Sequence, residues 1–244
     1  MAGHSKWANI KFRKSAQDAK RGKIFTKLIR EISVAARTGG AEESSNARLR
    51  DAITKALKAN MKRDTIDNAI KRGVGGLEGA NMAEMRYEGY APGGVAILVD
   101  CLSDNKNRTV SEVRHAFTKF GGNLGTDGSV AYLFTHRGEI LLAPTDQIDQ
   151  AMDVAIEAGA EDVSTQDGQV EVVTSVEKYH EVLTQLQASS IEVEEAHLTM
   201  HAETLIPVDK DTAETLLKLI DMLEDLDDVQ EVYTNADNLH EFAE

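Results

Sequence analysis

The sequence predicts a multidomain α+β protein in which an N-terminal helical domain precedes two ferredoxin-like α+β domains, one inserted into the other. Three observations support this class. The hydrophobic pattern has a helical period up to about Gly76 and mixes strand and helix periods after it. The β-α-β order then recurs along the chain. The charge is also divided, with 18 Lys and Arg against 7 Asp and Glu up to Gly76, and 9 against 34 beyond it.

The first helix is expected to begin near Ser15, which forms a capping box with Asp18 three residues later. Gly39 and Gly40 are suited to end it, because glycine readily adopts the left-handed conformation that closes helices. Its apolar stripe consists of Ile24, Leu28, Ile32 and Ala35. The spacing of these residues predicts one buried helical face.

Two shorter helices are expected to follow. Asn46 is a suitable N-cap for the second and Asp64 for the third, which Gly73 should close. Their apolar residues recur at helical spacing and are Leu49, Ala52, Ile53, Ala56 and Leu57 in the second, and Ile66, Ala69 and Ile70 in the third. The glycine-rich stretch after the third helix predicts a linker, so residues 1–80 are expected to form a basic segment and a helical domain.

The next part of the chain alternates strand and helix signals. The apolar run 94–102 predicts a buried strand. A helix should begin at Thr109, which forms a capping box with Glu112, and end at the glycine pair 121–122. Residues 130–134, Val-Ala-Tyr-Leu-Phe, are expected to form the next strand. A single β-α-β unit cannot close a core, so this domain needs further strands.

The segments that follow have the order strand, helix, strand, strand, helix, strand, which is the split β-α-β order of ferredoxin-like domains. A last unit begins with an expected strand at 203–209, continues with a helix, and ends with a strand at 229–235. We expect this unit to complete the domain left open at Phe134. The predicted domains are 1–80 (helical), 81–136 with 203–244 (discontinuous α+β) and 137–202 (inserted α+β).

The basic leading segment is the strongest functional signal. Nine cations lie from Lys6 to Arg30, and Asp18 is the only carboxylate among them. Cations gain free energy by displacing counterions from phosphate, and flat rings can stack on bases, so the segment is expected to bind nucleic acid. The alternative is a solvated helix face on which Trp7 is a packing anchor. The candidate residues are Lys6, Trp7, Lys11, Arg13, Lys14, Lys20, Arg21, Lys23, Lys27 and Arg30.

A second candidate anion site is the loop 103–109, where Lys106 and Arg108 lie beside the expected helix N-terminus. Free amides and the helix dipole favour an anion at such a position. A polar connection with two exposed cations is the equally open alternative. The glycine-rich loop 123–129 lacks the spacing of a phosphate-binding loop and is expected to be a turn.

The second and third helices have the spacing of a helix-turn-helix, but the third helix begins with Asp64 and carries Asp67 one turn later. Base contacts in that motif come from the N-terminal part of its second helix, so these carboxylates would face the phosphates. Sequence-specific insertion into the major groove is therefore not expected.

No catalytic or metal site is predicted. His197 and His201 lie on an expected strand, where their spacing separates them by about 13 Å, too far for a chelate. Cys101, the only cysteine, lies in an apolar strand and should be a buried thiol, with a reactive nucleophile as the alternative. No cofactor is implied, and the protein is not expected to be an enzyme. A small-molecule-binding or enzymatic α+β protein is the remote alternative, which a deep pocket with convergent polar side chains would reveal.

The chain contains no apolar run of about 18 residues, and its start lacks the apolar region of a secretory signal. A cytoplasmic protein without a membrane partner is therefore expected. The sequence does not predict an oligomeric state.

Four motifs, taken in order, resemble the YebC family. They are MAGHSKWANIK at 1–11, YEGYAPGGVAILVD at 87–100, SDNKNRT at 103–109 and GGNLGTDGSVAYLF at 121–134. The resemblance runs from Met1 to Tyr233. This family is also called the YebC/PmpR transcriptional regulatory proteins, and its mitochondrial relatives activate translation. The departures are minor, with Ala91 where glycine is common and Cys-Leu-Ser-Asp at 101–104 where a Thr-Asp pair is usual.

The resemblance implies one helical and two α+β domains, and a non-enzymatic factor in gene expression. The family is known for DNA-binding transcriptional regulators, while several members act on the ribosome to relieve stalling, including at proline runs. DNA and ribosomal RNA both stay open as partners, and with them the ribosome, because both present phosphate and no credible recognition helix is found.

Overall fold

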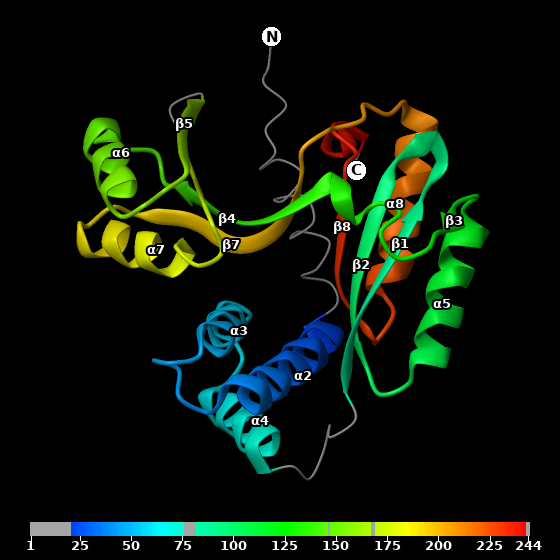
Figure 1. The fold of residues 1–244 in the computed structure, drawn as a ribbon, viewed down its shortest axis with the longest axis horizontal. Coiled ribbons are helices and arrows are strands. Elements are labelled where there is room, and N and C mark those ends of the chain that lie inside the picture. The colour runs from blue at the N-terminus through cyan, green and yellow to red at the C-terminus, as the bar shows by residue number, and fades with distance from the viewer. Residues whose placement is uncertain (1–20, 76–81, 146, 167–168, 243–244) are drawn as a thin grey trace. The chain divides into compact units, whose positions relative to one another are not determined.

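The computed structural model describes residues 21–75, 82–145, 147–166 and 169–242 of the 244-residue chain. The chain divides into two compact units. One is Phe134–Glu203, and the other contains the described residues up to Leu133 and from Thr204 onward. Helices packed on two four-stranded antiparallel sheets, together with an N-terminal helical region, confirm the predicted multidomain α+β class (Figure 1).

The helical region consists of α2 (Arg21–Gly39), α3 (Ala47–Lys58) and α4 (Arg63–Gly75). The start expected near Ser15 for the first helix lies outside the described residues, whereas its end at Gly39 is confirmed. Asn46 caps α3 as predicted, because its side-chain oxygen accepts from the Leu49 amide at 3.0 Å. Its amide nitrogen also donates to two carbonyls at the end of α2, so this buried side chain fastens α3 to α2.

Two predictions for the third helix are corrected. Helix α4 begins at Arg63, so Asp64 lies in its first turn instead of at its cap. Gly73 does not close the helix but lies inside it. A Cβ atom on Gly73 would lie 2.2 Å from the carbonyl oxygen of Ser33, so glycine is needed there to let α2 and α4 approach closely.

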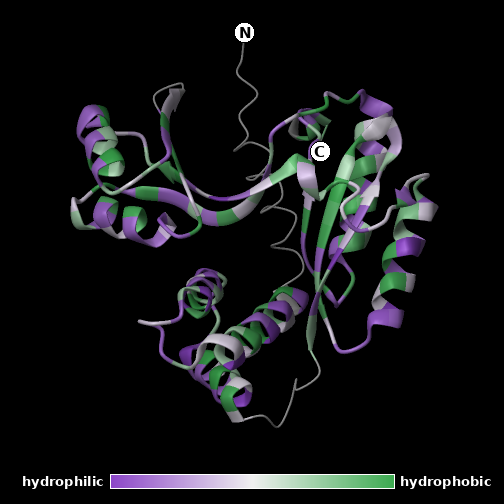
Figure 2. Ribbon diagram, viewed as in Figure 1, coloured by the Kyte–Doolittle hydropathy of each residue, from purple (hydrophilic) through white to green (hydrophobic). Residues whose placement is uncertain are grey.

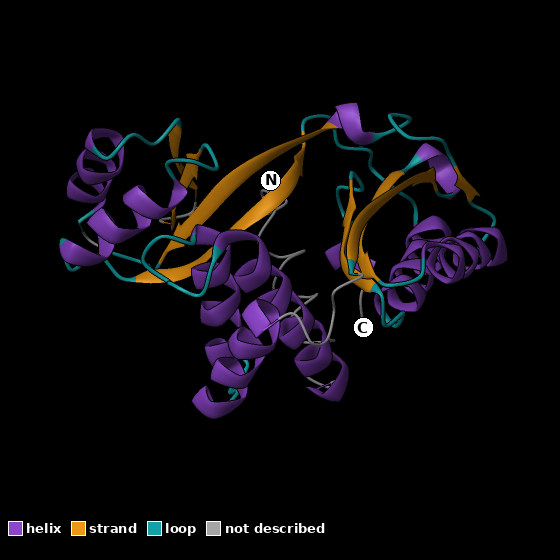
Figure 3. Ribbon diagram, turned by 60° about the horizontal axis from the view of Figure 1, so that its bottom comes forward, coloured by secondary structure: helices purple, strands orange, loops and turns teal. Residues whose placement is uncertain are grey.

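The first sheet has the strand order β3-β1-β2-β8. Its strands are β1 (Ala83–Tyr90), β2 (Ala96–Ser103), β3 (Asn123–Leu124) and β8 (Val229–Thr234). Helices α5 (Lys106–Lys119) and α8 (Lys210–Glu224) cover one face of this sheet (Figure 3). The apolar run predicted as a buried strand is β2, which is hydrophobic along most of its length (Figure 2).

Two predicted strands of this region are wrong. Residues 131–133 form a short 3₁₀ turn instead of a strand. The amides of Val130 and Ala131 donate to the Glu88 carboxylate, so they are not free to pair with a neighbouring strand. The segment 203–209 makes only an isolated bridge, between Ile206 and Ala236, and contains a proline that has no amide to donate. The strand that pairs with β2 on the side away from β8 is β1, with which it forms an antiparallel hairpin.

The second sheet follows the predicted ferredoxin-like order. Its elements are β4 (Phe134–Leu142), α6 (Ile148–Glu157), β5 (Asp162–Gln166), β6 (Gln169–Thr174), α7 (Tyr179–Ala188) and β7 (Val193–Ala202). The strand order is β5-β6-β4-β7, with every neighbouring pair antiparallel. Helices α6 and α7 cover one face, where Ile140 and Leu142 join the core (Figure 3).

Candidate nucleic-acid interface

The structure describes part of the predicted basic interface. The residues Lys6, Trp7, Lys11, Arg13, Lys14 and Lys20 lie outside the described residues, and the side chain of Arg21, which opens α2, is not described either. The candidates that can be placed are Lys23, Lys27 and Arg30 on α2, and Lys106 and Arg108 at the start of α5.

Helix α2 separates apolar and basic residues. Ile32 and Ala35 are fully buried in the core that α2 forms with α3 and α4. Lys23, Lys27 and Arg30 are separated by four and three residues, which places them along one side of the helix. The first turn of α2 contains no acidic residue. We call these three residues the α2 cation row.

The α2 cation row contacts the connection between α8 and β8. Lys23 Nζ donates to the carbonyl oxygen of Asp225 at 3.0 Å, and Lys27 Nζ donates to that of Glu224 at 2.7 Å. Arg30 Nη1 donates to the carbonyl oxygen of Asp227 at 2.6 Å. All three cations therefore bind main-chain carbonyls at, or just beyond, the C-terminus of α8.

The end of α8 explains why cations gather there. The last carbonyls of a helix lack intrahelical donors, and the helix dipole places partial negative charge at that end. The last turn of α8 contains no basic residue of its own. Cations from α2, about 200 positions earlier in the chain, supply the donors that the helix lacks.

Lys27 is partly buried. Burial lowers the pKa of its ammonium group, against the opposing attraction of Glu224, Glu231 and Asp225. The nearby acceptors therefore stabilise the charged form of Lys27, while its partial loss of contact with water destabilises that form. A phosphate group, which is negatively charged, could accept the same hydrogen bond from Lys27.

Asp228 anchors the α8–β8 connection to the first sheet. Its side chain is 2% exposed and accepts hydrogen bonds from the hydroxyls of Ser103 and Thr109, both at 2.9 Å. Arg108 Nη2 donates to it at 2.7 Å, and Arg30 Nη1 at 3.2 Å. Burial alone would raise the pKa of Asp228, but the hydrogen bonds, from Arg108 first, hold it below its usual value.

The loop 103–109 joins this cluster. Asn105 caps α5, and Arg108 divides its guanidinium between Asp228 and Asp104. Arg108, one of the two cations expected to bind an external anion, is thus bound to two carboxylates of the protein. Lys106 is exposed at the first residue of α5.

The start of α4 is neutralised locally. Arg63 forms ion pairs with Asp67, at 3.1 Å, and with Glu43. Asp64 is exposed in the first turn. Two carboxylates and a paired arginine thus occupy the part of this helix that would enter a major groove in a helix-turn-helix protein.

The glycine-rich loop is a turn that an internal carboxylate closes. Glu88 accepts hydrogen bonds from the amides of Gly128, Val130 and Ala131, each at 2.7 Å. Burial alone would raise the pKa of Glu88, but these three amides lower it. These amides are therefore occupied by a carboxylate of the protein and do not form a phosphate cradle.

The two histidines of β7 lie beside a buried carboxylate, and the cysteine is buried. His197 and His201 lie on β7 at 3.8 and 3.4 Å from the buried carboxylate of Glu139, which also pairs with Arg137 at 2.9 Å. Among the described residues, no group of three His, Cys, Asp or Glu side chains could hold a metal ion. Burial, followed by the charge of Asp100, raises the pKa of Cys101 to about 12, so its thiol stays protonated.

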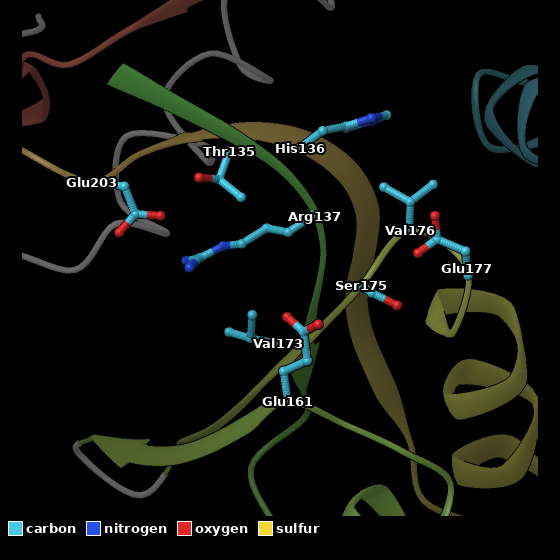
Figure 4. Close-up of a pocket in the computed structure, with 9 residues that line it drawn as sticks. All are labelled: Thr135, His136, Arg137, Glu161, Val173, Ser175, Val176, Glu177 and Glu203. Carbon is cyan, nitrogen blue, oxygen red and sulfur yellow. The ribbon is translucent and has the colours of Figure 1, made fainter. Parts of the chain in front are cut away.

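A pocket of about 450 Å³ lies in the Phe134–Glu203 unit (Figure 4). Its lining includes Glu161, Glu177 and Glu203, while His136 points away from Arg137. The Arg137 guanidinium is committed to Glu139.

Two family models match nearly the whole chain. Residues 5–76 match the N-terminal domain of TACO1/YebC proteins, and residues 82–236 match their second and third domains. The chain belongs to the TACO1/YebC family. The resemblance indicated by the four sequence motifs is thereby confirmed. Among the described residues, no helix of this TACO1/YebC protein is long and apolar enough to cross a membrane.

The relatives cover the chain almost completely. A probable transcriptional regulatory protein of Legionella pneumophila is 73% identical over 97% of this chain and 96% of its own length. One of the same name from Francisella tularensis is 59% identical over 100% of this chain and 99% of its own. The crystal structure of a conserved hypothetical protein from Aquifex aeolicus has a TM-score of 0.77 at 47% identity and covers 90% of this chain and 91% of its own.

Sequence reasoning found the cations but missed their partners. Glu224, Asp225 and Asp227 act through main-chain carbonyls, which carry no side-chain signal. Asp228 lies in an acidic run, Glu224 to Asp228, whose composition is typical of a solvated surface. Its position directly before β8, whose first residue Val229 is fully buried, is the signal that distinguishes it.

Proposed function

We propose that this protein regulates gene expression by binding nucleic acid through phosphate contacts made by its basic N-terminal region, including the α2 cation row. The observation that carries the proposal is the concentration of nine cations in residues 6–30 with a single carboxylate among them. Fixed cations release counterions from a nucleic acid, which supplies affinity without base contacts. The names of the relatives, probable transcriptional regulatory proteins, agree with this role.

The proposed mode of recognition is shape and phosphate. Asp64 lies in the first turn of α4 and Asp67 one turn later, and like charges there oppose insertion of that helix between phosphate chains. Ribosomal RNA is the second candidate target, and the same acidic helix start favours it, because structured RNA is recognised largely without major-groove helices. Catalysis and a small-molecule cofactor form no part of the proposal.

Crosslinking in cells, followed by sequencing of the bound nucleic acid, tests the function and names the target. The test variant replaces Lys11, Arg13, Lys14, Lys20 and Arg21 by Ala. The matched control replaces five exposed cations outside the N-terminal region, namely Arg114, Lys119, Lys178, Lys210 and Lys218. We expect the test variant to lose the crosslinks and the control to keep them. Equal recovery from both variants would contradict the proposal.

Competition between a candidate promoter and its scrambled sequence tests the mode of recognition. If side chains read base edges, each mismatch should cost about 1–3 kcal/mol. We expect the two duplexes to compete equally at about 150 mM salt. A preference of a hundredfold or more for the promoter would overturn shape reading.

A further inference from the structure

The segment Glu224–Asp228 has the chemistry of a short polyanion. Four of its five residues are acidic, and the carboxylate of Asp225 lies 3.6 Å from Lys23 Nζ. Its carbonyl oxygens accept from each member of the α2 cation row. The donors that would bind phosphates therefore already have anionic or dipolar acceptors.

The α2 cation row matches a backbone-tracking site in shape. A helix rises about 1.5 Å per residue, so Lys23 and Arg30 are about 10 Å apart along α2, with Lys27 between them. A line of cations along a groove is how proteins follow a nucleic-acid strand. Segment 224–228 runs beside this line, where its carbonyls accept from all three cations in turn.

We propose that segment 224–228 is an intramolecular competitor of nucleic acid: it occupies the α2 cation row in the free protein and is displaced when phosphates bind. The inference rests on the proposed function. Displacement can begin at the Lys23–Asp225 pair, because both side chains are about half exposed and solvent screening makes exposed ion pairs weak. A phosphate chain brings full negative charges to cations that the segment satisfies mainly with carbonyl dipoles.

The anchor of the segment permits this exchange. Asp228 keeps Ser103, Thr109 and Arg108 as partners when Arg30 leaves. These three lie on β2, or on α5 beside it, and not on α2. Releasing the α2 cation row therefore leaves β8 paired and the first sheet intact.

The binding test uses the full-length variant Asp225→Asn/Asp227→Asn. The matched control, Asp149→Asn/Asp153→Asn, removes the same charge from exposed positions on α6. Affinity for a duplex DNA and for a structured ribosomal RNA fragment is measured at about 150 mM salt by fluorescence anisotropy. We expect the test variant to bind about fivefold more tightly than the wild type and the control to stay within twofold. Equal gains in both variants would overturn the inference.

Hydrogen exchange separates competition from a general electrostatic gain. The amides of Asp225 and Leu226 are bonded to Asp221 and Leu223 at the end of α8. We expect saturating nucleic acid to speed their exchange in the wild-type protein, because the α2 cation row leaves this end. Unchanged or slower exchange would overturn the inference even if affinity rose. If neither the wild type nor the variant binds nucleic acid at any salt concentration, the proposed function fails and this inference fails with it. If both bind with the same affinity, only this inference fails.

Discussion

Helices α2 and α4 both carry cations in their N-terminal halves, but those cations have different partners. On α2, Lys23 and Lys27 bind carbonyls at the end of a helix about 200 positions later in the chain. On α4, Arg63 pairs with Asp67 in the next turn and with Glu43 nearby in the sequence. The first turn of α2 has no acidic residue, whereas that of α4 contains Asp64.

The difference teaches that the carboxylates around a cation, more than the cation itself, decide what it can bind. Arg63 is neutralised by side chains of its own helical region, which a nucleic acid would have to displace while approaching further carboxylates. The α2 cation row is bound by segment 224–228, which in the proposed exchange gives up its carbonyl contacts with these cations while Asp228 stays anchored to the first sheet. We therefore expect nucleic-acid binding to depend on α2 and not on α4.

The largest effect should come from neutralising the α2 cation row. Replacing Lys23, Lys27 and Arg30 together by Gln removes three phosphate contacts, each contributing about fivefold at 150 mM salt, so affinity should fall about 100-fold. Fluorescence anisotropy with duplex DNA and with structured RNA measures the change. A fall of less than threefold would break the distinction between the two helices.

The next largest effect should come from removing the side chain of Asp228, which anchors the α8–β8 connection to the first sheet. Asp228→Ala leaves the buried hydroxyls of Ser103 and Thr109, and two guanidinium groups, without their shared acceptor. We expect the free energy of unfolding in urea to fall by about 3 kcal/mol. The control Asp104→Ala removes an exposed partner of Arg108 and should change it by about 0.5 kcal/mol at most. If the free energy of unfolding fell by a similar amount in both variants, Asp228 would not be the anchor of this connection.

Acid should weaken the same anchor. The folded-state pKa of Asp228 is held below its unfolded value, so its stabilisation is present above that unfolded value and is lost as the pH falls through the folded one. The free energy of unfolding should therefore drop as the pH falls below about 4. Urea titrations of Asp228→Asn over the same range should show a flatter decline. An identical decline in wild type and variant would contradict this role.

The smallest effect should come from α4. Arg63→Gln breaks two exposed ion pairs, so the free energy of unfolding should change by about 0.5 kcal/mol or less. Nucleic-acid affinity should stay within about twofold, since Arg63 is already neutralised. A tenfold loss of affinity would place the interface on α4 and invert the comparison.

Much of the fold follows from local patterns in the sequence. The N-cap Asn46, the end of α2 at Gly39, and the ferredoxin-like order of the second sheet were all predictable, because caps and periodicity act over a few residues. The first sheet was harder. Segment 203–209 has the pattern of a strand, but its proline and the competing hairpin strand β1 exclude it from the ladder. The predicted domain boundaries, with 137–202 as a separately folding insert, stay a prediction.

The candidate site was predictable as a set of cations and not as a set of contacts. Clustered Lys and Arg without carboxylates are visible in the sequence alone. Lys27 and Arg30 both donate to main-chain carbonyls close to 200 residues away, and no side-chain pattern encodes those acceptors. Arg108 illustrates the same point, because the sequence cannot tell that the buried Asp228 lies beside its guanidinium.

The salt dependence of binding tests the central claim most directly. The dissociation constant for a nucleic acid is measured from about 50 to 200 mM salt for the wild type, for the five-residue N-terminal alanine variant and for the control with five cations replaced elsewhere. We expect the slope of the logarithm of the dissociation constant against the logarithm of the salt concentration to fall by about 0.7–0.9 for each phosphate that the N-terminal variant no longer binds, and to stay at the wild-type value in the control. An unchanged slope in the N-terminal variant would show that the phosphates are bound elsewhere on the protein.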